Sequence, residues 1–146
     1  MPHVVILYTN NLEKQTDMSV LCRSLADTML SIFAEDGQQV FPTGGTRVFA
    51  YPAPHYAVSD GGNAGRAAGG DGDYGFIYIN LRMGTGRSDT VKKAAGDALL
   101  SCAKSHLSPL FSNTGTHLGL TVQVDEAPGQ VYDGKHSTLH PLFTRK

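Results

Sequence analysis

Pro2 is a residue whose type suggests chemistry as well as structure. It stands immediately before an apolar run, residues 3–8, that is typical of a buried strand. Proline lacks an amide hydrogen and is tolerated in a sheet at an edge, at a bulge or as the first residue of a strand, so one interpretation is a tolerated strand opener. The other is that removal of Met1 leaves the ring nitrogen as the chain terminus. Such an amine has an ordinary pKa of about 7.7–8.0, which nearby positive charge lowers, so it can act as a general base near neutral pH.

Arg87 occupies a position suited to binding an anion. It lies between the end of a predicted strand and the start of a predicted helix, in the segment Met-Gly-Thr-Gly-Arg-Ser-Asp at 83–89. Glycines let a ligand approach the backbone, a helix N-terminus carries partial positive charge, and a guanidinium grips a carboxylate through two hydrogen bonds. The alternative is a tight turn with a solvated arginine. Asp89 stands where a dinucleotide-binding motif needs its third glycine, so nucleotide binding is not expected.

Arg47 opens a second predicted strand, where an arginine commonly faces solvent. In a sheet built from two β-α-β units, however, Arg47 belongs to the same half as Pro2, and Arg87 lies in a turn of the other half. The topology therefore allows all three residues to meet at a boundary between subunits.

The composition excludes several classes of partner. Twelve basic and 13 acidic side chains leave the net charge close to zero, which argues against nucleic acid and an anionic membrane surface. No apolar stretch is long enough to span a membrane and no signal peptide is visible, so we expect a cytoplasmic protein. Cys22 and Cys102 fall in helical patterns, and we expect buried free thiols and not a disulfide. The six histidines and the acids lack metal-ligand spacing, and we expect neither a metal nor another cofactor.

The regular elements that must position these residues occur twice in the same order. Apolar periodicity predicts strands at 3–9, 46–51, 74–83 and 118–125. It also predicts a helix capped by Asp17 or Thr16 that runs to Phe33, and a helix capped by Ser88 that runs to about His106. The two copies are offset by about 71 residues. Right-handed crossovers then predict an α+β fold, in which tandem β-α-β units form a four-stranded mixed sheet with two helices on one face.

A single domain is expected over 1–146. Its two pseudo-repeats, about 1–58 and 74–126, are joined by a glycine-rich stretch at 59–73 that is typical of a mobile surface loop. Residues 127–146 lose regular pattern, and we expect this C-terminal tail to pack on a neighbouring subunit. Both faces of the first strand are apolar, while the two helices cover only one face of the sheet. Packing of sheets between identical subunits would cover the other.

Several motifs together resemble the 5-carboxymethyl-2-hydroxymuconate isomerase family of the tautomerase superfamily. In chain order they are Pro2-His3 before an apolar strand, Phe41-Pro42 with Gly45-Thr46-Arg47, Gly84-Thr85-Gly86-Arg87-Ser88, Lys104-Ser105-His106, and His140-Pro141-Leu142-Phe143. The likeness extends over nearly the whole chain.

The resemblance implies a homotrimer and a metal-free keto-enol isomerisation of a small dicarboxylic or tricarboxylic dienol from aromatic catabolism, such as 5-carboxymethyl-2-hydroxymuconate. Pro2 would be the general base, and Arg47 and Arg87 would bind substrate carboxylates and stabilise the developing enolate. We therefore predict Pro2, Arg47 and Arg87 as the catalytic residues. Two alternatives stay open: hydration, dehalogenation or decarboxylation of a small unsaturated acid on the same site, and a non-catalytic trimer that binds carboxylates.

Overall fold

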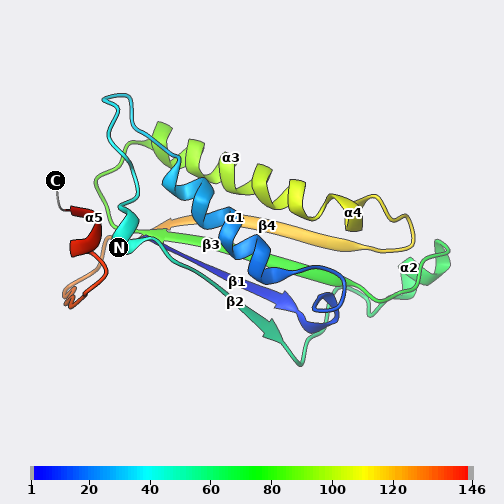
Figure 1. Cartoon of the computed structure of the whole chain (residues 1–146). Helices are drawn as coiled ribbons and strands as arrows, with labels where there is room; N and C mark the ends of the chain where they lie inside the picture. Colours follow the sequence, from blue (N-terminus) through cyan, green and yellow to red (C-terminus); the bar gives the residue numbers. More distant parts are fainter. Residues whose placement is uncertain (1, 145–146) are drawn as a thin grey trace.

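The computed structural model describes residues 2–144, which form one mixed four-stranded sheet in the order β2-β1-β3-β4 (Figure 1). The strands are β1 (His3–Thr9), β2 (Val48–Ala53), β3 (Gly75–Met83) and β4 (Leu118–Glu126). Within each half the strands are parallel, β1 with β2 and β3 with β4, whereas β1 and β3 pair antiparallel at the centre. This is the mixed sheet that the duplicated pattern predicted.

Two long helices, α1 (Met18–Leu30) and α3 (Asp89–His106), cover one face of the sheet, as predicted (Figure 1). Each begins at the expected cap: the Asp17 carboxylate accepts hydrogen bonds from two amides of α1, and the Ser88 hydroxyl accepts one from Val91. These side chains satisfy amides that the first turn of a helix leaves without partners. The chain also forms short helices, namely η1 (Asn10–Leu12), η2 (Thr43–Gly45), α2 (Asn63–Ala67), α4 (Ser108–Phe111) and α5 (Pro141–Thr144).

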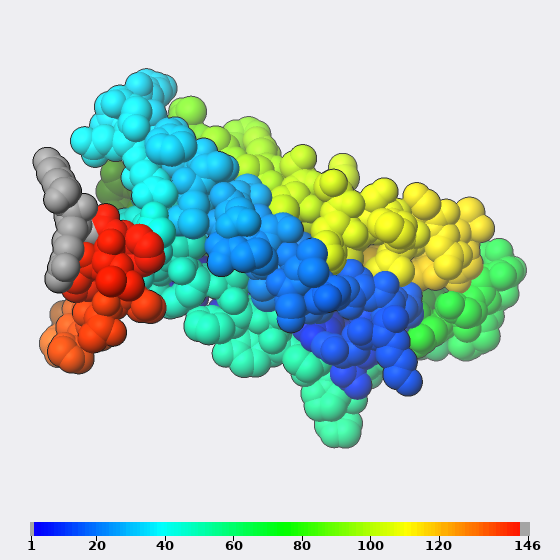
Figure 2. Space-filling model, in the orientation of Figure 1, coloured from blue at the N-terminus to red at the C-terminus, as the bar shows by residue number. Residues whose placement is uncertain are grey.

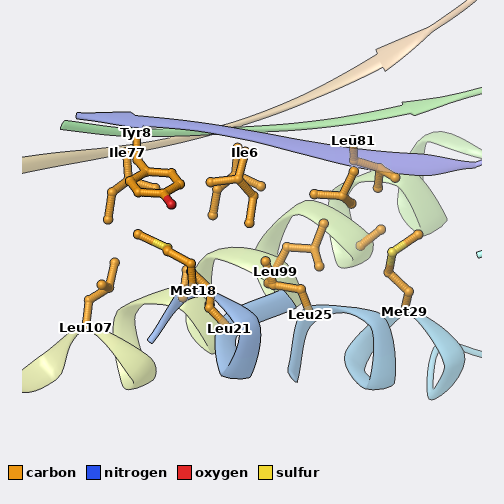
Figure 3. Close-up of a cluster of buried hydrophobic side chains, with 14 of the residues drawn as sticks. Ile6, Tyr8, Met18, Leu21, Leu25, Met29, Ile77, Leu81, Leu99 and Leu107 are labelled. Atoms are coloured by element: carbon orange, nitrogen blue, oxygen red, sulfur yellow. The ribbon is translucent and has the colours of Figure 1, made fainter. Parts of the chain in front are cut away.

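The core lies between the sheet and these two helices (Figure 3). Alternate residues of β1 and β3, among them Ile6 and Ile79, point toward the helices and are fully buried. They contact the apolar faces of α1 and α3, which include Leu25 on α1 and Leu99 on α3. None of the helices within residues 2–144 is both long and apolar enough to cross a membrane.

Several strand ends differ by one or two residues from the sequence-based predictions, and three differences have a clear physical reason. Helix α1 ends at Leu30 rather than Phe33, because the chain turns at Ser31 and Phe33 forms an isolated bridge with Gln39. Strand β2 runs through Pro52 to Ala53, which is possible because β2 is an edge strand and can lack one amide hydrogen. The glycine-rich stretch is not wholly irregular, since it contains the single-turn helix α2.

The topology gathers four chain segments at one end of the sheet. The starts of β1 and β2 and the ends of β3 and β4 all lie there, because β3 and β4 run opposite to β1 and β2. The C-terminal tail leaves β4 at this end, and α5 returns to contact η2 of the same chain (Figure 2). Residues 145–146, the last two of the predicted tail, lie outside the described residues.

Candidate active site

A cavity of about 840 Å³ opens at this end of the sheet. Pro2, Arg47 and Arg87, the three residues singled out by the sequence, all line it. Each comes from a different segment: the start of β1, the start of β2 and the turn after β3. The structure therefore brings the three together at one cavity of a single chain.

Pro2 is buried at the start of a central strand, not at a sheet edge. Two residues later the Val4 amide donates a 2.9 Å hydrogen bond to the Arg47 carbonyl, which ties the start of β1 to the start of β2. This pairing fixes Pro2 and Arg47 on adjacent segments. The position before the first paired residue is one where a missing amide hydrogen costs no ladder hydrogen bond.

The Arg87 guanidinium is held in place by backbone carbonyls and by an aromatic ring. Its Nη2 donates to the Val40 carbonyl at 3.2 Å and its Nη1 to the Gly84 carbonyl at 3.4 Å, while its Cζ lies 5.3 Å from the centre of the Phe41 ring. Gly86 has a φ of 112°, a conformation that favours glycine, and it turns the chain just before Arg87. Carbonyls and a ring face orient the group without neutralising its charge.

The Arg47 guanidinium is likewise oriented by a carbonyl, since its Nη1 donates to Gly45 at 2.8 Å. Among residues 2–144 neither Arg47 nor Arg87 forms an ion pair with a carboxylate. Both are half-buried. Two positive charges thus face the cavity without a directly paired acid, and an anionic ligand would be attracted to them.

The N-terminus of α3 contributes less than the sequence suggested. Its amides are partly satisfied by its own Ser88 cap, and neither Ser88 nor Asp89 lines the cavity. Lys92, in the first turn, pairs with Glu126 at 2.5 Å and with Asp89 at 3.0 Å. The positive charge that this turn offers to the cavity is therefore the Arg87 side chain, not the helix end.

The C-terminal tail forms a wall of the cavity that sequence reasoning missed. The lining residues from the tail include Asp133, Lys135, His136, Ser137 and His140. The available signal was the cluster of charged and imidazole side chains in 133–140, which would be unusual in a tail whose only role is apolar packing. No local sequence pattern, however, indicates that this segment folds back onto its own chain.

The second repeat does not reproduce the site at the opposite end of the sheet. There Tyr74 precedes β3 and His117 precedes β4, in the places that Pro2 and Arg47 take in the first repeat, and they line a separate hollow of about 530 Å³. The glycine-rich stretch packs on this hollow, where the Gly65 amide donates to the Tyr74 hydroxyl at 2.9 Å. Among residues 2–144, Pro2 and two guanidinium groups gather at the first end alone, so we assign one candidate site to each chain. Among residues 2–144 no cluster of metal-ligating side chains is found.

Comparison with known proteins places this geometry in context. A family model described as 5-carboxymethyl-2-hydroxymuconate isomerase matches residues 2–143. A crystal structure of a 5-carboxymethyl-2-hydroxymuconate delta-isomerase is 54% identical, with a TM-score of 0.94, over 100% of this chain and 95% of that one. A 5-carboxymethyl-2-hydroxymuconate isomerase from Deinococcus radiodurans R1 is 28% identical, with a TM-score of 0.78, over 99% and 95%. A curated relative, the 5-carboxymethyl-2-hydroxymuconate Delta-isomerase of Escherichia coli, is 24% identical over 98% of this chain and 99% of its own.

Proposed function

This chain belongs to the 5-carboxymethyl-2-hydroxymuconate isomerase family of the tautomerase superfamily, and we propose that it isomerises a small unsaturated 2-hydroxy acid with Pro2 as the base. The observation that supports the proposal is the meeting of Pro2, Arg47 and Arg87 at one cavity. An amine that can be neutral near pH 7 and two cations are the groups that a proton shift in an acidic dienol requires.

The proposed reaction transfers one proton and needs no other reactant. The Pro2 nitrogen, freed by removal of Met1, takes the proton of the 2-hydroxyl group. The electron pair left on oxygen forms the ketone, and the double bonds shift along the carbon skeleton of the substrate. The proton is then returned to the substrate carbon at the far end of the former diene. The same nitrogen serves as base and then as acid, so the enzyme ends as it began.

The two arginines are proposed to orient the substrate and to stabilise the charge that develops on it. A guanidinium matches a carboxylate in shape and offers two parallel hydrogen bonds. The positive charge of Arg47 and Arg87 also favours the neutral form of a neighbouring amine, so we expect the Pro2 pKa to lie below its ordinary value. The ring of Pro2 restricts the direction of the nitrogen lone pair.

An ultraviolet assay tests this function directly, because conjugation changes when a dienol becomes an enone. The purified protein is expected to convert a 2-hydroxymuconate-type dienol faster than buffer alone, and 5-carboxymethyl-2-hydroxymuconate faster than a dienol with fewer carboxylates. The Arg47→Ala variant serves as the site control. If the protein leaves every dienol at the uncatalysed rate but binds carboxylates, the non-catalytic alternative replaces this proposal.

We also propose that the protein works as a homotrimer whose subunits cover the open face of the sheet. Leu7 and Tyr51 are paired across β1 and β2, and they lie with Phe49 and Phe76 on the face opposite the helices. These four side chains are 37–54% exposed in the single chain. An apolar face of this kind commonly marks a contact between proteins.

A charge on this open face is expected to break the trimer. In size-exclusion chromatography with light scattering, the unchanged protein should have about three times the mass of one 15.6 kDa chain, and Tyr51→Lys should have less. Phe111→Lys is the matched control, since Phe111 is 46% exposed but lies on α4, outside this face. A trimeric Tyr51→Lys protein would place the subunit contact elsewhere.

A further inference from the structure

The C-terminal tail lines the cavity between two points at which it contacts the rest of the chain. At its start the Ala127 amide donates to the Met83 carbonyl at 2.9 Å, which continues the pairing of β4 with β3. Near its end His140 packs directly on the backbone of η2, because a Cβ placed on Gly44 would lie 2.7 Å from the His140 Cα. The segment between these points lines the same cavity as Arg47 and Arg87.

An ion pair lies in the middle of this segment. The Lys135 ammonium donates to the Asp133 carboxylate, and both side chains line the cavity. The pKa of Asp133 is lowered by this hydrogen bond and, to a smaller extent, by the charges of Lys135 and Arg47. Asp133 is therefore an ionised carboxylate that lies in the field of the same arginine that faces the cavity.

We propose that Lys135 determines specificity by binding a third carboxylate of the substrate, which takes the place of Asp133 as its partner. This inference rests on the proposed function. A muconate skeleton carries two carboxylates, and a carboxymethyl group adds the third. Arg47 and Arg87 provide for two of them, so a tricarboxylate needs one more cation in the same cavity.

Among residues 2–144, Lys135 is the one lysine that lines this cavity. Lys92, which lies five residues after Arg87, is less suitable. It forms ion pairs with Asp89 and Glu126 and lines another hollow. Exchange of one carboxylate for another also keeps the Lys135 charge paired before and after binding, so binding does not require an unpaired ammonium to be desolvated. The tail thus supplies the Lys135 cation, and Asp133 is its ion-pair partner until a substrate carboxylate replaces it.

The test compares substrates with three, two and one carboxylates in the full protein. Lys135→Gln is expected to lower kcat/KM for the tricarboxylate dienol about tenfold or more, because a charge-assisted hydrogen bond is lost. The dicarboxylate and monocarboxylate dienols should change little. Asp133→Asn is expected to raise kcat/KM for the tricarboxylate selectively, since it removes a competing charge and leaves Lys135 in place.

Lys93→Gln is the matched control, because Lys93 forms a similar pair with Asp97 on α3 and does not line this cavity. Equal losses on all three substrates, or no loss on the tricarboxylate, would overturn the inference. Calorimetric binding of tricarballylate and glutarate, saturated acids with three and two carboxylates, gives a readout independent of turnover. A protein inactive on every dienol contradicts the proposed function, whereas an unchanged preference for tricarballylate in Lys135→Gln contradicts the role of Lys135 alone.

Discussion

Replacement of Pro2 by alanine is expected to lower kcat/KM for a 2-hydroxymuconate-type dienol by about 10²–10⁴-fold, the usual contribution of a positioned general base. Alanine leaves a primary amine at the chain terminus, so the chemical group survives in altered form. What is lost is the ring that fixes the nitrogen and its lone pair beside Arg47 and Arg87. The measurement is the rate of the ultraviolet change at several substrate concentrations, and the loss should fall mainly on kcat.

The control for this variant is Pro54→Ala, which removes an exposed proline after β2 that does not line the cavity. Unchanged circular dichroism and an unchanged oligomeric state in Pro2→Ala would assign the loss to chemistry instead of folding. A Pro2→Ala protein with nearly full activity would show that Pro2 is only a tolerated strand opener. The non-catalytic alternative would be favoured only if the unchanged protein, too, bound carboxylates and converted no dienol.

Replacement of Arg87 by alanine is expected to lower kcat/KM for an acidic dienol by about 10²–10³-fold, as when a group that stabilises developing negative charge is removed. The methyl ester of the same dienol should lose much less, because it has no carboxylate for the guanidinium to bind. For the acidic dienol, the kcat/KM of Arg87→Lys should lie between those of the unchanged protein and Arg87→Ala. An ammonium keeps the charge but cannot form the bidentate contact or the same contact with Phe41.

Arg23→Ala controls for the change in net charge, because Arg23 is an exposed residue of α1 that pairs with Asp27. Arg23→Ala should leave kcat/KM unchanged for both the acid and the ester. Equal losses of acid and ester in Arg87→Ala would mean that the arginine acts on the shape of the turn, not on a carboxylate.

The sequence predicted the main elements because their signals are local. Asp17 and Ser88 cap helices whose apolar residues repeat at three and four, and the alternation in residues 118–125 matches β4. The end of α1 was predicted wrongly because it depends on a contact formed after the helix. Phe33 continues the helical spacing of α1, yet the chain leaves the helix at Ser31 so that Gln39 can pair with Phe33.

The candidate site was predictable as far as residue types and topology allowed. Pro2, Arg47 and Arg87 have groups suited to proton transfer and anion binding. Parallel pairing of β1 with β2 and antiparallel pairing of β1 with β3 place their segments at one end of the sheet. The part played by the tail was not predictable. Its position depends on the close packing of His140 on Gly44, a contact between segments almost 100 residues apart that leaves no periodic signal.

Intact-mass spectrometry of the purified, active protein tests the central claim most directly. If the Pro2 nitrogen is the base, the active protein must lack Met1, and its mass must correspond to a chain that begins at Pro2. A fully active protein that still carries Met1 would have an amide at Pro2, which cannot accept a proton near neutral pH, and would contradict the account.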